Sequence, residues 1–184
     1  MKRFLIIAGI AVAVLIILGG VVRYVMTKQE KSLSPEEQIS YHQDNLQIQV
    51  FYNRPSKKGR VIFGELVPFD QVWRTGANEA TTFETNVDLS FEGKILKKGK
   101  YSLWTIPGEE TWTIIFNAEH GQWGLGPEGE ANRDPTRDVL SLSVHAVQSD
   151  REFEQFTISF EKVGEEVEMV LIWDATLVAV PFSY

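Results

Sequence analysis

Apolar and polar residues alternate with a period of two along most of the chain after residue 45. This alternation predicts half-buried β-strands, because successive side chains of a strand point to opposite faces of a sheet. A last edge strand is expected at 177–181, since Pro181 cannot donate to a sheet. The predicted strands before it are 46–52, 83–91, 100–106, 111–117, 139–147, 152–162 and 167–173.

Short turns separate these strands. Asp44-Asn45 and Glu92-Gly93-Lys94 are typical of tight turns, and residues 118–137 form the longest loop. About eight or nine short strands predict an all-β fold, namely an antiparallel β-sandwich of jelly-roll or Ig-like type, with a barrel as the alternative. The residues expected to form its core are Ile48, Val50, Phe83, Val87, Leu89, Leu103, Ile114, Phe116, Leu140, Leu142, Phe156, Ile158 and Leu171.

The first residues follow another pattern. Phe4–Val22 contains no charged or strongly polar side chain. As a helix with about 1.5 Å rise per residue it would span about 28 Å, close to the hydrocarbon thickness of a bilayer. The run is longer than that of a cleavable signal peptide, and no small-x-small cleavage pattern follows it. We therefore expect one N-terminal transmembrane signal-anchor helix, with the lipid bilayer as the partner of residues 4–22; secretion after signal cleavage is the alternative.

The sequence thus predicts three parts. Residues 1–28 form the membrane anchor, residues 29–44 a juxtamembrane spacer with a first hairpin or a short helix, and residues 45–184 the β-sandwich domain. Hairpin and helix both remain open, because residues 34–37 fit a helix start whereas residues 38–42 alternate. The short basic N-terminus resembles an export signal, which favours a single-pass membrane protein with its C-terminal domain on the extracytoplasmic, periplasmic side.

The distribution of charge limits the partners of this domain. The chain holds 18 basic and 25 acidic residues, and Lys2, Arg3, Arg23 and Lys28 all precede the first acidic residue. The part beyond residue 28 is therefore strongly acidic, which argues against a nucleic-acid partner. Cysteine is absent and histidine occurs three times, so thiolate sites are excluded and a histidine-rich metal site is disfavoured. We expect no metal and no cofactor.

Residues 52–81 lack sustained alternation and carry several basic side chains of an otherwise acidic domain. Guanidinium groups pair bidentately with carboxylate or phosphate, so this local charge inversion suits an anionic ligand. Arginines in a loop-rich segment also bind backbone carbonyls or neighbouring acids, and this structural alternative remains open. The predicted ligand-binding residues are Arg54, Lys58, Arg60, Arg74, Asn78, Glu79 and Trp123.

Some of these residues could do more than bind. Glu79 could act as a general base, and with His120 it could make an acid–base pair if the fold brought the two together. Asn78 could instead cap a structural turn, with Glu79 paired to Arg74, and His120 could be a surface-loop histidine. Trp123 lies between Gln122 and Gly124 in a loop, where its ring could be an exposed platform for a sugar.

Long ordered motifs carry a resemblance to a known family. They are 53–60 (NRPSKKGR), 63–68 (FGELVP), 72–81 (VWRTGANEAT), 100–108 (KYSLWTIPG), 112–117 (WTIIFN), 122–124 (QWG) and 156–158 (FTI). From about residue 34 to about residue 160 the chain resembles a bacterial family catalogued as domain of unknown function 2911. Members typically follow an export signal, so the resemblance implies an extracytoplasmic β-domain, and it implies no activity. The glycine- and acid-rich loop 125–137 departs from the more compact, aromatic segment of many members.

Three functions are compatible with these features. The first is a membrane-tethered binding or accessory module of the cell envelope for a small anionic, glycan or peptide ligand. The second is a structural or interaction protein with another envelope protein as its partner. The third is a hydrolase that uses Glu79 or His120. The irregular, arginine-bearing segment favours the first of these functions.

Overall fold

The computed structural model describes the backbone of residues 2–184 and the side chains of residue 9 and residues 12–184. The side chains of Lys2 and Arg3, and most of those in the first half of the predicted anchor, lie outside the described residues. Contacts divide the chain between Leu33 and Ser34 into two compact units.

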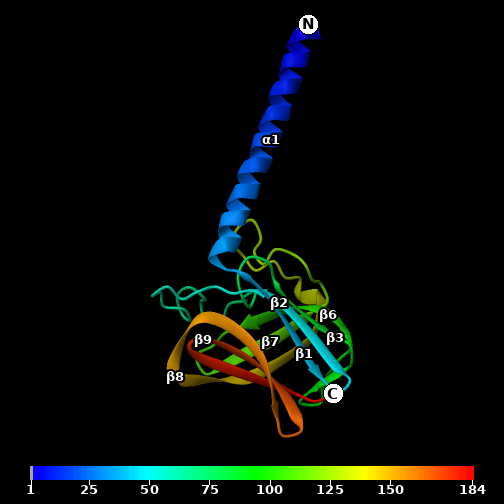
Figure 1. The fold of residues 1–184 in the computed structure, drawn as a ribbon, viewed down its shortest axis with the longest axis vertical. Coiled ribbons are helices and arrows are strands. Elements are labelled where there is room, and N and C mark those ends of the chain that lie inside the picture. The colour runs from blue at the N-terminus through cyan, green and yellow to red at the C-terminus, as the bar shows by residue number, and fades with distance from the viewer. Residues whose placement is uncertain (1) are drawn as a thin grey trace. The chain divides into compact units, whose positions relative to one another are not determined.

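The first unit is the helix α1 (Lys2–Leu33). Its segment Val12–Leu33 is long and apolar enough to cross a membrane or to serve as a signal sequence. The expected N-terminal apolar helix is therefore present (Figure 1). The helix also includes residues 29–33, which the sequence assigned to the juxtamembrane spacer.

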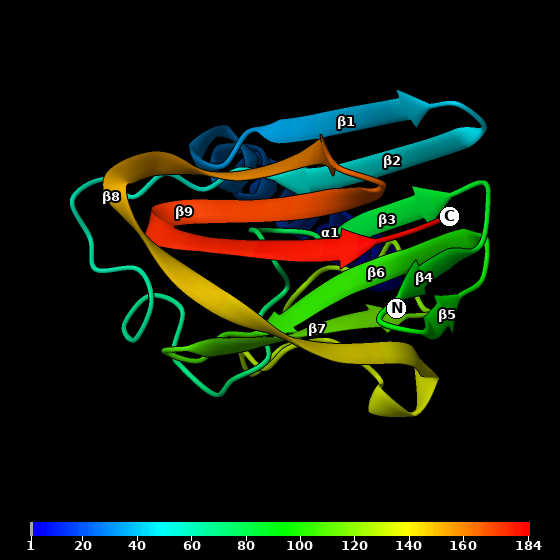
Figure 2. The ribbon, with the colours of Figure 1, turned by 90° about the horizontal axis from the view of Figure 1, so that it is seen from below.

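The second unit consists of nine strands, and seven of them form one antiparallel sheet in the order β1-β2-β3-β6-β7-β8-β9. The remaining two, β4 and β5, pair with each other. The sheet curls as a half-barrel, with the long hairpin of β8 and β9 bending along its length (Figure 2). The predicted all-β antiparallel fold with one preceding helix is confirmed. The bounds are β1 (Glu36–Gln43), β2 (Leu46–Asn53), β3 (Thr81–Thr85), β4 (Leu89–Phe91), β5 (Lys94–Leu96), β6 (Gly99–Ile106), β7 (Thr111–Asn117), β8 (Asp138–Val163) and β9 (Glu166–Phe182), with a single 3-10 turn at Pro135–Arg137.

The hydrophobic core lies on the inner face of the curled sheet. Every predicted core residue is buried there except Val87, which is half-buried and packs against the same cluster. A second, smaller cluster lies outside that core. It consists of Ala80, Trp104 and Ile115, with half-buried Val72 and Ala131 packed against it. The loops that carry Val72, Ala80 and Ala131 are therefore anchored by apolar burial, not only by backbone turns.

The first strand settles an alternative that the sequence left open. Residues 36–43 form β1 and not a helical turn, and they pair with β2 from Glu36↔Asn53 to Gln43↔Leu46. Asp44, at the turn between them, has a φ of 51°. Ile39 and Tyr41 pack against the inner core, so burial of alternate residues favours the strand over the helix.

The prediction of one strand over 83–91 is wrong. The chain leaves the sheet after Thr85 and pairs elsewhere as β4. Asn86 fixes this break, because its Oδ1 accepts the Gln47 N–H at 2.7 Å and its Nδ2 donates to the Asn45 carbonyl at 2.9 Å. The residues before and after the break both face the core, which explains why the alternation continues through it.

The C-terminal strands are longer than predicted. The segments 139–147 and 152–162 are parts of one strand, β8, and the two last predicted strands are both parts of β9. Register shifts between Gln148 and Phe153, and between Phe153 and Thr157, allow β8 to bend without ending. The polar residues 148–151, between the two predicted strands, therefore lie at a bulged bend in a continuous hairpin.

Candidate functional site

Two irregular segments, 54–80 and 118–134, lie between strands of the second unit. Trp73 ties the first segment to β6, because its backbone N–H donates to the Thr105 carbonyl at 2.7 Å and its carbonyl accepts the Thr105 N–H at 3.0 Å. The two segments also join each other, since Gly124 N–H donates to the Asn78 carbonyl at 2.9 Å. The predicted site residues lie on this pair of segments.

Arg54 is a structural residue. Its Nε donates to the Phe156 carbonyl at 3.2 Å and its Nη2 donates to Thr157 Oγ1 at 2.8 Å. Its Nη1 lies 3.5 Å from a carboxylate oxygen of Glu37. The guanidinium therefore connects the end of β2 to β8 and to β1. With all three nitrogens engaged, Arg54 does not present a free guanidinium to a ligand.

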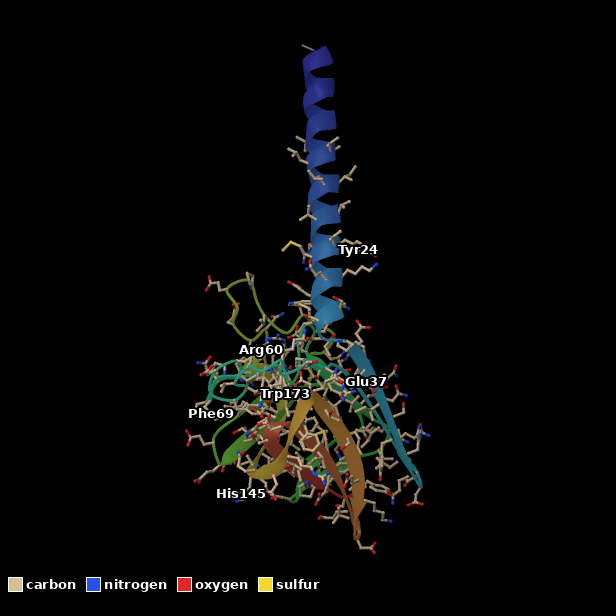
Figure 3. All side chains as sticks on the ribbon, turned by 60° about the vertical axis from the view of Figure 1, so that its left-hand side comes forward. Tyr24, Glu37, Arg60, Phe69, His145 and Trp173 are labelled. Atoms are coloured by element: carbon tan, nitrogen blue, oxygen red, sulfur yellow. The ribbon has the colours of Figure 1, made fainter. Side chains whose placement is uncertain are left out.

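The other early basic residues also hold the loop. Arg60 donates from Nε to the Lys57 carbonyl at 3.0 Å and from Nη2 to the Ser56 carbonyl at 2.6 Å. Arg60 is exposed at the surface (Figure 3). Lys58 is exposed too, and its backbone N–H donates to a carboxylate oxygen of Glu154 at 2.9 Å. These contacts are those of the alternative in which basic residues of a loop bind backbone carbonyls or neighbouring acids and hold the loop in place.

Lys57 makes the strongest charge contacts of this loop. Its Nζ lies 2.6 Å from Asp174 Oδ1 and 2.8 Å from Glu152 Oε2. Hydrogen bonds to these two carboxylates raise the pKa of Lys57. Asp174 has a φ of 55°, so Lys57 contacts β9 at a residue in the left-handed region. Lys57 therefore links the loop to the bent hairpin of β8 and β9 by ion pairs.

Asn78 and Glu79 form part of a closed turn. Asn78 Nδ2 donates to Asn53 Oδ1 at 3.2 Å, and Asn53 Nδ2 donates to Glu79 Oε2 at 3.0 Å. Asn78 is buried and has a φ of 57°, which asparagine tolerates better than most residues. Gly76 is required for another reason, since a Cβ there would lie 2.9 Å from the Asn53 carbonyl oxygen. Asn78 is therefore part of a structural turn, but its side chain bonds the Asn53 side chain and not the backbone groups that a capping role requires.

Arg74 differs from the other basic residues of the segment. Its Nε is buried without a hydrogen-bond partner. Among the residues that the structure describes, its guanidinium forms no ion pair and no hydrogen bond. Burial lowers the pKa of Arg74, because removing water disfavours the charged form. The predicted alternative of an Arg74–Glu79 pair is not observed.

Packing against Gly124 fixes the Arg74 side chain. A Cβ at position 124 would lie 2.1 Å from Cδ and 2.8 Å from Cβ of Arg74. Only glycine leaves room for the arginine stem beneath this loop. The guanidinium is thus positioned by shape, without a polar contact to hold its charged end.

Arg74 lines a cavity of about 540 Å³, which we call the Arg74 cavity. Its walls are mainly apolar. The second acidic or basic group in the lining is Glu130, whose carboxylate turns back to accept the Glu128 N–H at 2.9 Å. The lining residues are Leu66, Val67, Pro68, Gln71, Val72, Trp73, Arg74, Leu125, Gly129, Glu130 and Ala131.

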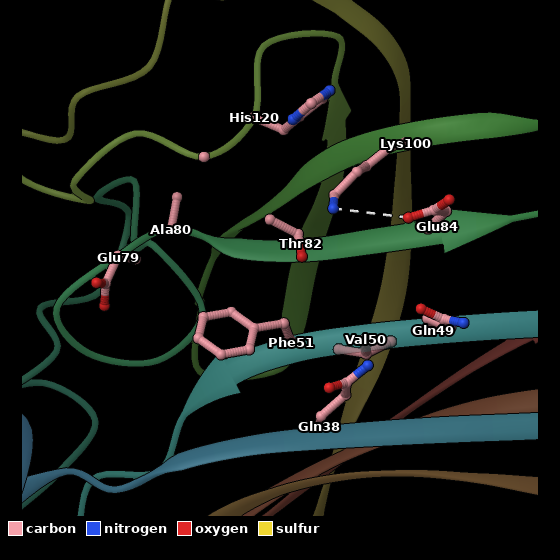
Figure 4. Close-up of a pocket in the computed structure, with 11 residues that line it drawn as sticks. Gln38, Gln49, Val50, Phe51, Glu79, Ala80, Thr82, Glu84, Lys100 and His120 are labelled. Atoms are coloured by element: carbon pink, nitrogen blue, oxygen red, sulfur yellow. Dashed lines mark ion pairs between the residues drawn. The ribbon is translucent and has the colours of Figure 1, made fainter.

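Glu79 and His120 line a different cavity, of about 390 Å³. It lies on the outer face of the sheet over β1, β2, β3 and β6 (Figure 4). The structure therefore brings the two catalytic candidates to one cavity, but no hydrogen bond joins the His120 side chain to the described residues. A hydrolytic role for Glu79 or His120 stays a prediction.

Trp123 lies outside both cavities and is 36% exposed. The backbone carbonyl of Trp123 accepts a hydrogen bond from the Asn132 side chain, whose Nδ2 lies 2.9 Å away. The other four tryptophans are buried. The described residues contain no group of three or more histidine, aspartate or glutamate side chains able to hold a metal ion.

Sequence reasoning missed the partners that shape the Arg74 cavity. Leu66 and Leu125 come from segments without periodicity, so nothing in the pattern indicated that they would face Arg74. Gly124 carried a detectable signal, because a glycine directly after an aromatic loop residue is typical of a close approach of backbone to another group. Phe51 also carried one, as the single apolar side chain on the polar face of its predicted strand.

Comparison with known proteins gives a family and nothing beyond it. Residues 34–182 match the family described as protein of unknown function, DUF2911. The matched range corresponds closely to the second unit of the structure, which begins at Ser34. No curated protein and no solved structure matches the chain.

Proposed function

We propose that this chain, which belongs to the DUF2911 family of proteins of unknown function, is a membrane-tethered binding module that holds a small amphipathic anion against Arg74. The single observation that carries this proposal is the buried Arg74 Nε without a partner, in a cavity with mainly apolar walls. The ligand class is a carboxylate or phosphate joined to a compact apolar body.

A buried charged group without a partner raises the free energy of the folded protein. A guanidinium N–H removed from water loses its hydration, which a protein normally offsets with a carboxylate or with carbonyls. Arg54 and Arg60 receive such partners within the same segment, whereas Arg74 receives none among the described residues. An anion in the cavity would supply the missing hydrogen-bond acceptors and form a charge-assisted contact.

The cavity walls indicate the rest of the ligand. Leu66, Val72 and Leu125 contribute apolar surface beside the guanidinium. The volume of about 540 Å³ falls in the range of ordinary small-molecule sites, about 300–1,000 Å³. An inorganic anion alone would leave most of this space unfilled, so an apolar body attached to the anionic group fits better.

Location is the second part of the proposal. The apolar helix α1 supports attachment of the binding unit to a bilayer, with the C-terminal unit on the extracytoplasmic side as the basic N-terminus favours. An alkaline phosphatase fused to Tyr184 should be active in cells, because this enzyme requires an oxidising compartment. An inactive fusion would reverse the orientation without affecting the Arg74 site.

The binding proposal is tested on the full chain in detergent, with phenyl phosphate and hexanoate as probes and benzyl alcohol as the uncharged comparison. At least one anionic probe should raise the melting temperature of the wild type, because a ligand that binds only the folded state stabilises it. Arg74→Met keeps the stem but removes the charge, so affinity should fall about 10- to 100-fold. Glu130→Gln should raise affinity slightly, by removing a nearby negative charge.

Lys58→Met is the matched control, since Lys58 is a basic residue of the same segment outside the Arg74 cavity. It should bind the probes as the wild type does. A melting temperature that responds to neither anion would overturn the proposal. So would an equal loss in Lys58→Met, because binding would then reflect the general basic character of the segment.

A further inference from the structure

The second cavity, on the outer face of the sheet, has a floor built by two cross-strand rows of side chains. Strand pairing aligns Gln38 with Phe51 and Phe51 with Thr82 in the first row. It aligns Gln49 with Glu84 in the second row. We call this the Phe51 cavity, because the Phe51 ring lies in the middle of its floor (Figure 4).

Phe51 has no role in the packing of the protein that would explain its side chain. It belongs to neither of the two apolar clusters, whereas Val50 and Tyr52, on the opposite face of β2, are part of the inner core. The other residues on this face of β2 are Gln47, Gln49 and the buried Asn53, and Phe51 is only half-buried. An aromatic ring at the centre of a polar row is therefore available to a ligand.

Polar groups surround this ring on several sides. Gln38 and Gln49 are exposed and carry amides, each of which can donate and accept hydrogen bonds. Lys100 Nζ lies 3.6 Å from Glu84 Oε2, so an ammonium and a carboxylate face the same space in a defined arrangement. His120 stands on the loop at the rim of the cavity (Figure 4).

We infer that the Phe51 cavity binds an uncharged pyranose unit of an oligosaccharide. A pyranose presents C–H groups on one face, which stack on an aromatic ring, and hydroxyl groups around its rim, which pair with planar amides and carboxylates. A volume of about 390 Å³ lies near the lower end of ligand-site volumes, about 300–1,000 Å³, and suits one or two sugar rings.

The charged side chains that line the cavity favour a neutral sugar over an acidic one as the ligand. Two carboxylates, Glu79 and Glu84, face the cavity with one ammonium, Lys100. Lys100 is already paired with Glu84. An acidic sugar would find no unpaired lysine or arginine in this lining, whereas neutral hydroxyl groups would find both donors and acceptors. This site shares no lining residue with the Arg74 cavity, so the two proposals stand independently.

The test is calorimetric titration of the full chain in a zwitterionic detergent, because glycoside detergents would compete for the site. The probes are cellotetraose, maltotetraose, xylotetraose and N-acetylchitotetraose. At least one should bind at millimolar concentration or below. Phe51→Ala should weaken that binding about tenfold and Gln49→Ala about threefold, whereas Phe51→Tyr should retain it.

Two controls make the outcome decisive. Phe51→Leu keeps apolar bulk without an aromatic ring, so it should lose binding even if Phe51→Ala fails to fold. Trp123→Ala removes the exposed loop tryptophan outside the cavity and should bind as the wild type does. Wild-type affinity in Phe51→Leu would overturn the inference, as would absence of binding by all four probes or a tenfold loss in Trp123→Ala.

Discussion

The irregular segment after β2 holds two sets of basic residues close together in sequence. They differ in whether their charged groups have hydrogen-bond or ion-pair partners. Arg54, Lys57 and Arg60 are tied to carbonyls, a hydroxyl or carboxylates of their surroundings. Arg74 carries the same charge, yet its buried Nε meets no acceptor. The first set stabilises the connection between loop and hairpin, whereas Arg74 faces a cavity.

In the proposed function, this difference separates charge that supports the fold from charge that is available to a ligand. Local density of basic residues does not distinguish the two, because all of these residues lie in the same run of sequence. What distinguishes them is the pairing of each guanidinium or ammonium group after folding. We therefore assign the anion site to Arg74 alone and not to the whole basic segment.

The largest effect is expected from Arg54→Met. The substitution leaves the Phe156 carbonyl and the Thr157 hydroxyl without their arginine partner and removes the contact to Glu37. We expect the free energy of unfolding to fall by about 2–3 kcal/mol. Urea unfolding followed by tryptophan fluorescence measures this change. Arg60→Met is the control and should lose about 0.5 kcal/mol or less, because its contacts lie on the surface. An equal loss of unfolding free energy in the two variants would contradict the structural role assigned to Arg54.

A slightly smaller loss is expected from Gly124→Ala, because the added methyl group would collide with the Arg74 stem. Overpacking of this kind costs about 2 kcal/mol. In an Arg74→Ala background the same glycine substitution should be nearly neutral, since the colliding side chain is gone. A double-mutant cycle with four urea curves measures the coupling. Additive effects would mean that Gly124 does not position Arg74.

The ionisation of Tyr52, in the inner core, makes the stability of the fold depend on pH. Its hydroxyl accepts the Ile158 N–H at 3.1 Å, and burial raises its pKa. A raised folded-state pKa gives stability that is complete below the unfolded pKa of about 10 and is lost as pH rises above it. Tyr52→Phe should therefore lose about 1.5 kcal/mol at neutral pH and show a shallower decline above pH 10. An alkaline profile that is unchanged in Tyr52→Phe would contradict the assignment.

Much of the fold could be predicted from the sequence, because burial of one face imposes a period of two on each strand. The pattern located the core and nearly all strands, and the ordered motifs identified the family. It failed at residue 86, where the break depends on side-chain hydrogen bonds of Asn86 and not on hydrophobicity. It also split β8, because polar residues at a bulge resemble a turn.

The site was less accessible to sequence reasoning. Arg74 was among the predicted residues, but so were Arg54, Lys58 and Arg60, and no pattern separates an arginine whose partners lie a hundred residues away from one that has none. The distances between Arg54 and its acceptors on β8 exist only after folding. Phe51 was visible as an exception on a polar face, yet its neighbours across the sheet became known only from the register.

The most direct measurement is the sign of the change in unfolding free energy for Arg74→Met in the absence of ligand. Because burial lowers the pKa of Arg74, the charged form opposes folding at neutral pH, and a neutral side chain with the same stem should raise stability by about 1 kcal/mol. The same urea experiment should give a decrease for Arg54→Met. A decrease for Arg74→Met as well would show that its guanidinium stabilises the empty protein, and would contradict its assignment as a charge kept for a ligand.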